Sequence, residues 1–313
     1  MPDGHDPIPK PEPPGSADET KEQPAAPRRI LTRRRFVAGA GASVIGLGLY
    51  SNQIARHEIE TNHVTLALRN LPPAFEGFRI VQISDLHLDE FTEEYFLRRI
   101  VAHVNAIQAD LVLVTGDFIS DAPKSNAFAL AAAVRCGEIL HSLTCPLRFG
   151  CLGNHDASVG SRKVMERIQP SGLVILVNRF VPIERNGQHL WLCGLDDPGK
   201  GHPDIKLAVP AHAAAPVLLL GHEPDYAIAI VQRQHLSRVD VLLSGHSHGG
   251  QVRLPGGIPL TLPPGASTFY EGIYHIGHTE LYVNRGIGTV GVPFRLNCPP
   301  EITVFTLKGR AQV

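Results

Sequence analysis

The sequence predicts an α/β fold in which helices cover β-sheets. Short apolar runs typical of strands recur from about residue 60 onward, and segments of helical periodicity lie between several of them. The chain has 313 residues, which is ample for a substantial hydrophobic core. Polar residues of a restricted set follow directly after several of the apolar runs, so the pattern also indicates where a functional site lies.

The predicted strands share short, nearly continuous runs of apolar residues. They span residues 64–68, 79–83, 111–115, 147–152, 190–194, 217–220, 239–243, 281–283 and 302–307. Helical periodicity marks residues 97–107 and 225–235, and an alanine-rich helical segment spans 128–140. Residues 254–267 are rich in Pro and Gly, so we expect a long loop there, where functional residues tend to lie.

The N-terminus predicts a tail and a targeting segment. Residues 1–27 are rich in Pro, Asp, Glu, Lys and Gly and cannot bury enough apolar surface to become ordered, so we expect disorder. Within residues 28–55, the sequence TRRRFV at 32–37 precedes an apolar run that ends at Tyr50. This segment resembles a twin-arginine export signal.

Two features of this segment leave its processing open. The apolar run has about 15 residues, fewer than the ~20 that a bilayer-spanning helix needs. The sequence Gln53-Ile54-Ala55 lacks a small residue at its first position, so an uncleaved membrane anchor is the alternative to a cleaved signal. We expect residues 56–313 to be exported across, or anchored in, a bacterial cytoplasmic membrane and to lie on its extracytoplasmic side. The twin-arginine export machinery and the membrane are the partners that this segment implies.

Charge and cysteine usage argue against two classes of protein. There are 29 Lys and Arg residues against 30 Asp and Glu residues, so no global basic field favours nucleic acid as a partner. The five cysteines include no Cys-x-x-Cys pair, and an odd number cannot all pair internally, so we expect no disulfide framework.

Candidate site residues, seven of which are candidate metal ligands, follow five predicted strands at the point where each strand ends. They are Asp85 and His87, Asp117, Asn154 with His155 and Asp156, His222, and His246 with His248. Because ligands gather at the carboxyl ends of strands in α/β sheets, we expect these side chains to converge. Residues two apart on an extended segment point to the same side, so each closely spaced pair can reach one ion or two adjacent ions.

The chemistry of this set favours a binuclear metal site. The ligands are nitrogen and oxygen without thiolate, which suits Mn, Fe or Zn. Seven protein ligands are too many for one ion but suit two ions that share a carboxylate. Two ions about 3.5–4 Å apart lower the pKa of bound water and stabilise an in-line displacement at phosphorus.

The order of these motifs resembles the calcineurin-like metallophosphoesterase superfamily over roughly residues 78–307. The matching motifs are Asp85-x-His87, Gly116-Asp117, Gly153-Asn154-His155-Asp156, His222 and Gly245-His246-x-His248. The HGGQ sequence at 248–251 and segments 284–286 and 295–301 look like the bacterial branch that carries a twin-arginine signal. The resemblance implies a four-layer α/β/β/α sandwich of two mixed sheets flanked by helices.

The resemblance also implies a role for each site residue. Asp85, His87 and His248 would bind the first metal, Asn154, His222 and His246 the second, and Asp117 would bridge both. His155 would lie beside the scissile phosphate, stabilising charge or protonating the leaving oxygen, and Asp156 would orient it. The family often has Gly-Asp-x-x followed by Asp or Asn, whereas here the next acid, Asp121, comes one position later and its role is open.

Two arginines near the C-terminus have alternative roles. Arg285 and Arg295 are candidates to grip a substrate phosphate, or they brace the C-terminal strands, which is the reading we favour.

The expected activity is two-metal-dependent hydrolysis of a phosphodiester or pyrophosphate bond, in which a hydroxide that bridges the metals attacks phosphorus. We expect a small-molecule or lipid-linked substrate of the cell envelope. A UDP-2,3-diacylglucosamine pyrophosphatase of lipid A synthesis is the alternative, although its cytoplasmic substrate conflicts with export. A phosphomonoesterase is also open, because the metal site alone does not set the ester class. A non-catalytic binding module should have lost ligands or His155, and none is missing.

Overall fold

The computed structural model describes residues 32–89, 91–121, 125–232 and 239–310, and the predicted disordered tail, residues 1–27, lies outside them. The chain divides into two compact units, and the division falls between Val44 and Ile45, within helix α1 (Arg33–Gln53). The larger unit holds every strand and every predicted site residue. Among the described residues, no helix has the length and apolar character needed to cross a membrane.

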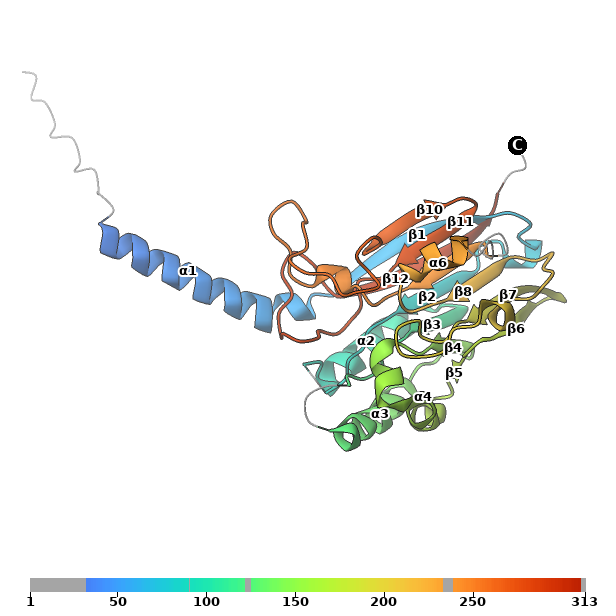
Figure 1. Cartoon of the computed structure of the whole chain (residues 1–313), viewed down its shortest axis with the longest axis horizontal. Coiled ribbons are helices and arrows are strands. Elements are labelled where there is room, and N and C mark those ends of the chain that lie inside the picture. The colour runs from blue at the N-terminus through green and yellow to red at the C-terminus, as the bar shows by residue number, and fades with distance from the viewer. Residues whose placement is uncertain (1–31, 90, 122–124, 233–238, 311–313) are drawn as a thin grey trace, which may run out of the picture. The chain divides into compact units, whose positions relative to one another are not determined.

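Two six-stranded mixed sheets form the larger unit (Figure 1). The first sheet runs in the order β1 (Glu60–Leu68), β12 (Glu301–Gly309), β2 (Arg79–Ile83), β3 (Leu111–Thr115), β4 (Arg148–Cys151) and β5 (Val174–Ile175). The second runs β10 (Gly272–Ile276), β11 (Thr279–Val283), β9 (Val241–Ser244), β8 (Val217–Leu220), β7 (Gln188–Gly194) and β6 (Arg179–Arg185). Parallel pairs form the centre of both sheets, so their carboxyl ends point the same way within each sheet.

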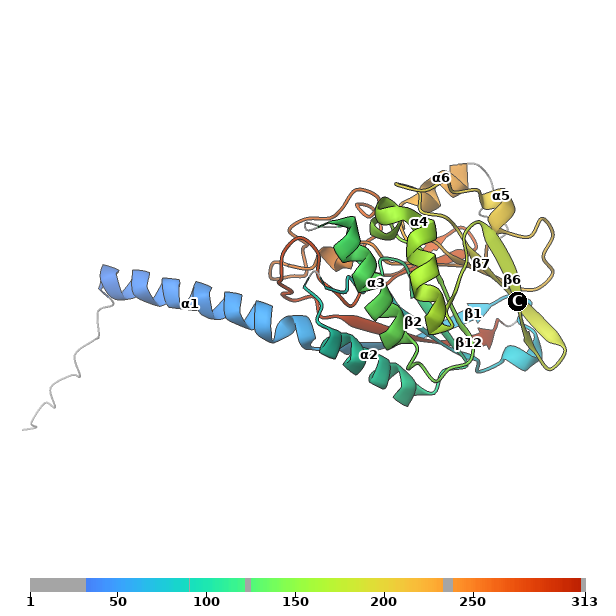
Figure 2. The same cartoon turned by 90° about the horizontal axis from the view of Figure 1, so that it is seen from below.

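Helices cover the outer face of each sheet. Helices α2 (Glu94–Ile107), α3 (Asn126–Leu140) and α4 (Asn154–Ile168) pack on the first sheet and lie side by side in Figure 2. Helices α5 (Ile205–Ala208) and α6 (Tyr226–Gln232) pack on the second. Short 3-10 turns lie at Ala55–His57, Pro73–Phe75, Gln169–Ser171 and His248–Gly250. This is the predicted four-layer α/β/β/α sandwich.

The central strands are apolar throughout because both of their faces are buried. In β3, Leu111 and Leu113 point into the core between the sheets, whereas Val112 and Val114 point toward the helices. Phe305 of the first sheet packs edge-to-face on Tyr282 of the second, with ring centroids 5.0 Å apart. The loops at the edge of the sandwich are therefore anchored on strands that the core packs on both faces.

The nine predicted strands are present, and three further strands were not predicted. Strand β5 has only two residues, too few for a pattern. Strands β6 and β10 lie at the edges of the second sheet and are not fully buried, so they lack a continuous apolar run. Helix α4 was also missed, because it begins within the Gly153–Asp156 motif and is interrupted by non-helical Gly160. All five cysteines are buried and free.

The end of helix α1 belongs to the larger unit. The Ser51 hydroxyl donates to the carbonyl of Arg295 at 2.8 Å, and the Asn52 amide donates to the carbonyl of Pro293 at 2.7 Å. Ser51 is buried by these contacts. The compact unit thus includes residues 45–55, which the sequence analysis assigned to the export segment.

We expect replacement of Ser51 and Asn52 together by Ala to lower the free energy of unfolding by about 1–3 kcal/mol, because two largely buried hydrogen bonds are lost. Urea denaturation measures this change. Ser43→Ala is the matched control, because its hydroxyl contacts only Gly39 of its own helix. Equal stability of the double variant and the control would show that this helix end is not part of the folded unit.

Candidate metal centre

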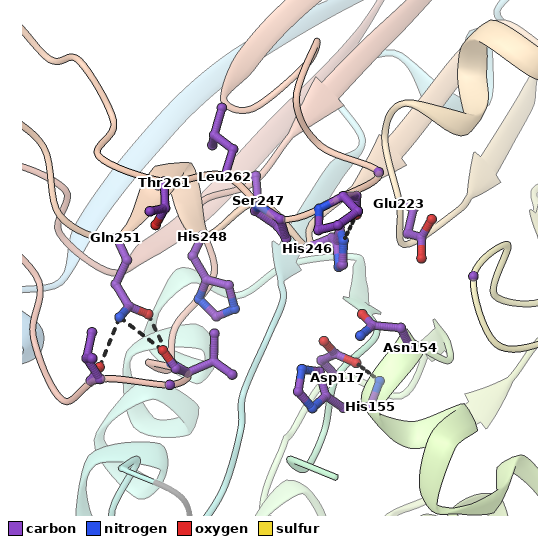
Figure 3. A pocket seen from close by; sticks show the side chains of 18 of the residues that line it. Asp117, Asn154, His155, Glu223, His246, Ser247, His248, Gln251, Thr261 and Leu262 are labelled. Atoms are coloured by element: carbon purple, nitrogen blue, oxygen red, sulfur yellow. Dashed lines mark hydrogen bonds between the residues drawn. The ribbon is translucent and has the colours of Figure 1, made fainter. Parts of the chain in front are cut away.

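The predicted ligands converge at the carboxyl ends of the central strands. Three groups each place one ligand atom per residue within 4.8 Å of the others: Asp85, His87 and His248; Asp117, His222 and His246; and His87, Asp117 and His155. Figure 3 shows Asp117, Asn154, His155, His246 and His248 around one cavity. The expectation that side chains at the carboxyl ends of the strands converge is therefore met by the three groups.

An unusual backbone conformation turns the ligands inward. Positive φ angles occur at Asp85 (51°), His87 (43°), Asp117 (52°), His246 (69°) and His248 (49°). Left-handed conformations cost non-glycine residues roughly 1–2 kcal/mol each and concentrate at functional sites. The loops after β2 and β3 hold each other in this shape, because Asp85 N–H donates to Gly116 O and His87 N–H donates to Asp117 O.

Asp117 lies between the two main groups. Its Oδ2 is 3.1 Å from His222 Nε2 and 3.5 Å from His87 Nε2. Its Oδ1 accepts a hydrogen bond of 2.9 Å from the His155 backbone N–H. The carboxylate is almost fully buried. Because it lies between His222 and His87, which belong to different groups, it occupies the position that a bridging ligand requires.

Hydrogen bonds on the far side of two rings fix their tautomers. His222 Nδ1 lies 2.7 Å from Thr115 O and must donate to it, so Nε2 presents its lone pair to Asp117. His246 Nε2 lies 2.8 Å from Pro264 O, so Nδ1 presents its lone pair to His222 Nε2 at 3.2 Å. Such facing lone pairs repel each other unless a cation or a proton lies among them.

The other group shows the same arrangement. His87 Nε2 and His248 Nε2 are 3.1 Å apart, and each lies 3.5 Å from a carboxylate oxygen. Ser120 fixes the His87 ring through Nδ1 at 2.8 Å. Asn154 Oδ1 is buried without a hydrogen-bond partner in the described chain, as an amide oxygen reserved for a cation would be. The residues present therefore fit metal binding.

The pKa values of the histidines agree with this function. Burial lowers the pKa of His87 and His248 well below the usual range, so both rings are neutral, as metal ligands must be. Burial opposes protonation of His222, but Asp117 raises its pKa well above the usual range. Without a metal, a proton on His222 would supply the positive charge that this part of the site demands.

His155 stands at the edge of the ligand cluster. Its Nδ1 lies 2.6 Å from Asp121 Oδ1, and its ring meets the His87 ring edge-to-face with centroids 4.8 Å apart. Burial opposes protonation, but Asp117 and Asp121 raise the pKa of His155. An imidazole whose pKa is raised beside a carboxylate is suited to donate a proton into the adjoining cavity.

The prediction that Asp156 orients His155 does not agree with the structure. Its carboxylate accepts from the backbone N–H groups of Gly153 at 3.0 Å and Phe118 at 3.1 Å. Helix α4 begins at Asn154, and successive residues on a helix do not face each other, so Asp156 turns away from His155. Burial and the nearby Asp117 raise the pKa of Asp156 to about 7. Asp121, whose role the sequence left open, orients the ring instead.

Both C-terminal arginines brace the fold. Arg295 is fully buried and donates to the carbonyls of Cys298 and Gly286, each at 3.1 Å. Arg285 Nε lies 2.8 Å from Glu301 Oε2 in an ion pair. These contacts occupy their guanidinium groups with protein acceptors, as the bracing interpretation requires.

Sequence reasoning missed several residues that line or support the cavity. Ser120 orients His87, while Lys200, Glu223 and Gln251 line the cavity. Burial, with Asp197 nearby, raises the pKa of Glu223 to about 7. Glu223 directly follows the ligand His222 in the sequence, and this adjacency was the available signal. Gln251 is the last residue of the HGGQ sequence at 248–251, whereas Ser120 and Lys200 come from loops that carry no motif.

Gly153 tests whether the position of Asp117 controls metal binding. A Cβ at Gly153 would overlap Asp117 Oδ1 and lie 2.6 Å from its backbone N, so we expect Gly153→Ala to weaken metal affinity by about 10–100-fold. Gly221→Ala is the matched control, because Gly221 also precedes a ligand but its Cβ would meet only the end of Leu242 at 3.3 Å. Metal titration followed by elemental analysis compares the two. Equal affinities would contradict this account.

Comparison with known proteins agrees with the geometry of the site. The family model of calcineurin-like phosphoesterases matches residues 78–250. The uncharacterized metallophosphoesterase YkuE of Bacillus subtilis is 34% identical over 291 residues, which cover 89% of this chain and 98% of YkuE. Phosphodiesterase YaeI of Escherichia coli is 28% identical, covering 89% of this chain and 100% of YaeI. Among solved structures, the calcineurin-like phosphoesterase YfkN from Bacillus subtilis covers 67% of this chain and 81% of its own at 14% identity and a TM-score of 0.42.

The family match spans the strands and loops that deliver all seven predicted ligands, and the alignment with YkuE extends over nearly the whole chain. The chain therefore belongs to the calcineurin-like phosphoesterase family.

Proposed function

We propose that this chain binds two divalent transition-metal ions, of Mn, Fe or Zn, and hydrolyses a phosphodiester or pyrophosphate bond. The observation that carries the proposal is the position of Asp117, whose Oδ2 faces His87 on one side and His222 on the other. A single ion would leave half of the converging ligands without a partner. The related YaeI is named a phosphodiesterase, which favours that ester class for this chain too.

Different residues hold the metals, orient the histidine rings and donate the proton. When bound, two such ions would supply an activated water and neutralise charge on the phosphoryl oxygens. Asp117 and the surrounding histidines hold the site, and their partners Thr115, Pro264 and Ser120 fix the ring orientations. His155, held by Asp121, donates a proton to the leaving oxygen.

Two variants separate metal binding from proton donation. We expect Asp117→Asn to lose metal and activity together, because it removes the shared carboxylate. His155→Ala should retain metal but lower kcat by roughly 10²–10⁴. The loss should be smaller for a 4-nitrophenyl ester, whose leaving group hardly needs a proton, than for an alkyl phosphodiester. His212→Ala, in an exposed loop, is the control.

The measurements are metal content by elemental analysis and turnover of a phosphodiester, a pyrophosphate and a phosphomonoester. No bound metal and no activation by added Mn or Zn would overturn the proposal. Metal loss from His155→Ala would show that His155 is a ligand, as its place in the third group permits. Preference for the monoester or the pyrophosphate would select one of the alternative substrates.

We also propose that residues 28–55 direct the phosphoesterase domain to the extracytoplasmic side of the membrane, where a cell-envelope component is the substrate. The paired arginines Arg33 and Arg34 before an apolar run support this.

Replacing Arg33 and Arg34 together by Lys should block translocation, because the export receptor reads the guanidinium pair and not charge alone. Arg28 and Arg29 replaced by Lys are the matched control, since they lie upstream of the motif. Protease accessibility in intact spheroplasts reports the location. A double Lys variant that still reaches the far side would refute the twin-arginine assignment.

A further inference from the structure

A large cavity extends from the metal ligands well beyond the space that a phosphoryl group needs. Its volume is about 930 Å³, at the upper end of the roughly 300–1,000 Å³ typical of small-molecule sites. The ligands Asp117, Asn154, His246 and His248 form its floor. The remaining lining determines what else the substrate carries.

The two ends of this cavity differ in chemistry. The ionisable residues Lys200 and Glu223 line one part of it, and Gly199, next to Lys200, lies against the Glu223 carboxylate, which a Cβ there would overlap. A second part is an apolar wall, formed by Val252, Leu260, Leu262, Val290 and Val292. Figure 3 shows Glu223 on one side of His246 and His248, and Gln251, Thr261 and Leu262 on the other. The metal ligands thus stand between a polar end and an apolar end.

Hydrogen bonds build the apolar wall into the fold. The Gln251 amide donates to the carbonyls of Val290 at 3.2 Å and Val292 at 2.9 Å and accepts from Val290 N–H at 2.9 Å. Leu260 N–H donates to Val252 O at 3.0 Å. Because these contacts pair backbone groups of Val252, Leu260, Val290 and Val292, the wall presents its apolar side chains from a hydrogen-bonded backbone.

The wall is continuous with the metal centre and open to solvent. His246 Nε2 contacts Pro264 O at 2.8 Å, so the loop that forms the wall also fixes a ligand. Leu260 is 55% exposed and Val292 is 47% exposed. In the loop that holds Leu260, the side chains of Leu254 and Ile258 are also exposed, by 48% and 60%. A cluster of exposed large apolar side chains beside a reactive centre indicates that an apolar group covers them.

We propose that the substrate is an amphiphilic phosphoester with a long aliphatic chain, which lies along the wall of Val252, Leu260, Leu262, Val290 and Val292 while its polar part faces Lys200 and Glu223. This inference rests on the proposed function and specifies its substrate class. Hydrolysis adds water across the P–O bond, giving a phosphate monoester and an alcohol, and the chain anchors one side of that bond. Burial of the chain supplies binding energy remote from phosphorus.

A series of 4-nitrophenyl alkyl phosphate diesters tests the inference on the full chain loaded with Mn, below the concentration at which the substrates form micelles. Between methyl and octyl esters, we expect kcat/KM to rise by about fourfold for each methylene that the wall buries. Leu260→Ser and Val292→Ser, made separately, should each lower the octyl-to-methyl ratio by at least threefold. Leu207→Ser is the matched control, because Leu207 is 61% exposed on α5 and away from the cavity.

Calorimetry of methylphosphonate and octylphosphonate binding gives a readout other than turnover. The octyl compound should bind more tightly and with a more negative heat-capacity change, which Leu260→Ser should reduce. Hydrolysis of the methyl ester without any dependence on chain length would overturn this inference and leave the proposed function standing. Failure to hydrolyse any ester in the presence of Mn or Zn would overturn both.

Discussion

The buried carboxylate of Asp117 is the constraint on which the rest of the site depends. A buried charge is costly unless partners of opposite sign or hydrogen-bond donors compensate it. Here His155 N–H donates to one oxygen and the His222 ring faces the other. Because Thr115 O fixes the His222 tautomer, the ring can meet Asp117 favourably only through a proton or a metal ion. The site is therefore organised around a positive charge, which a bound cation or a proton on His222 would supply.

Holding these groups together requires a backbone that is unfavourable in isolation. Five ligand residues adopt left-handed conformations, and their combined cost must be met by the surrounding structure. The central strands are buried on both faces, between the helices and the second sheet, which anchors the turns that follow them. Gln82 adds a polar link between the sheets, since its amide donates to Thr115 at 2.8 Å and to the Ser244 carbonyl at 3.0 Å. The geometry of the site therefore depends on the stability of the sandwich.

The candidate ligands and the apolar lining of the cavity come from different parts of the chain. The ligands come from strand ends, which the sheets hold in place, whereas the cavity wall comes from the loops near Leu260 and Val292. Those loops also contact the end of α1, because Asn52 donates to Pro293 O, the residue after Val292. A change in these loops can therefore alter the cavity lining while leaving the candidate ligands in position.

The sequence by itself determined the central strands and the position of the seven candidate ligands at strand ends, because apolar periodicity and position at a strand end are local properties. The sandwich followed from the resemblance that the order of the site motifs carries. Edge strands such as β6 escaped detection, since exposure on one side removes the continuous apolar run. The tertiary structure decided which acid orients His155: helix α4 turns the neighbouring Asp156 away, and folding brings Asp121 to the ring. It also decided the contact between Ser51 and Arg295, 244 residues apart, and the apolar wall beside the candidate ligands. Such contacts join segments far apart in the sequence that share no pattern, so only the folded chain brings them together.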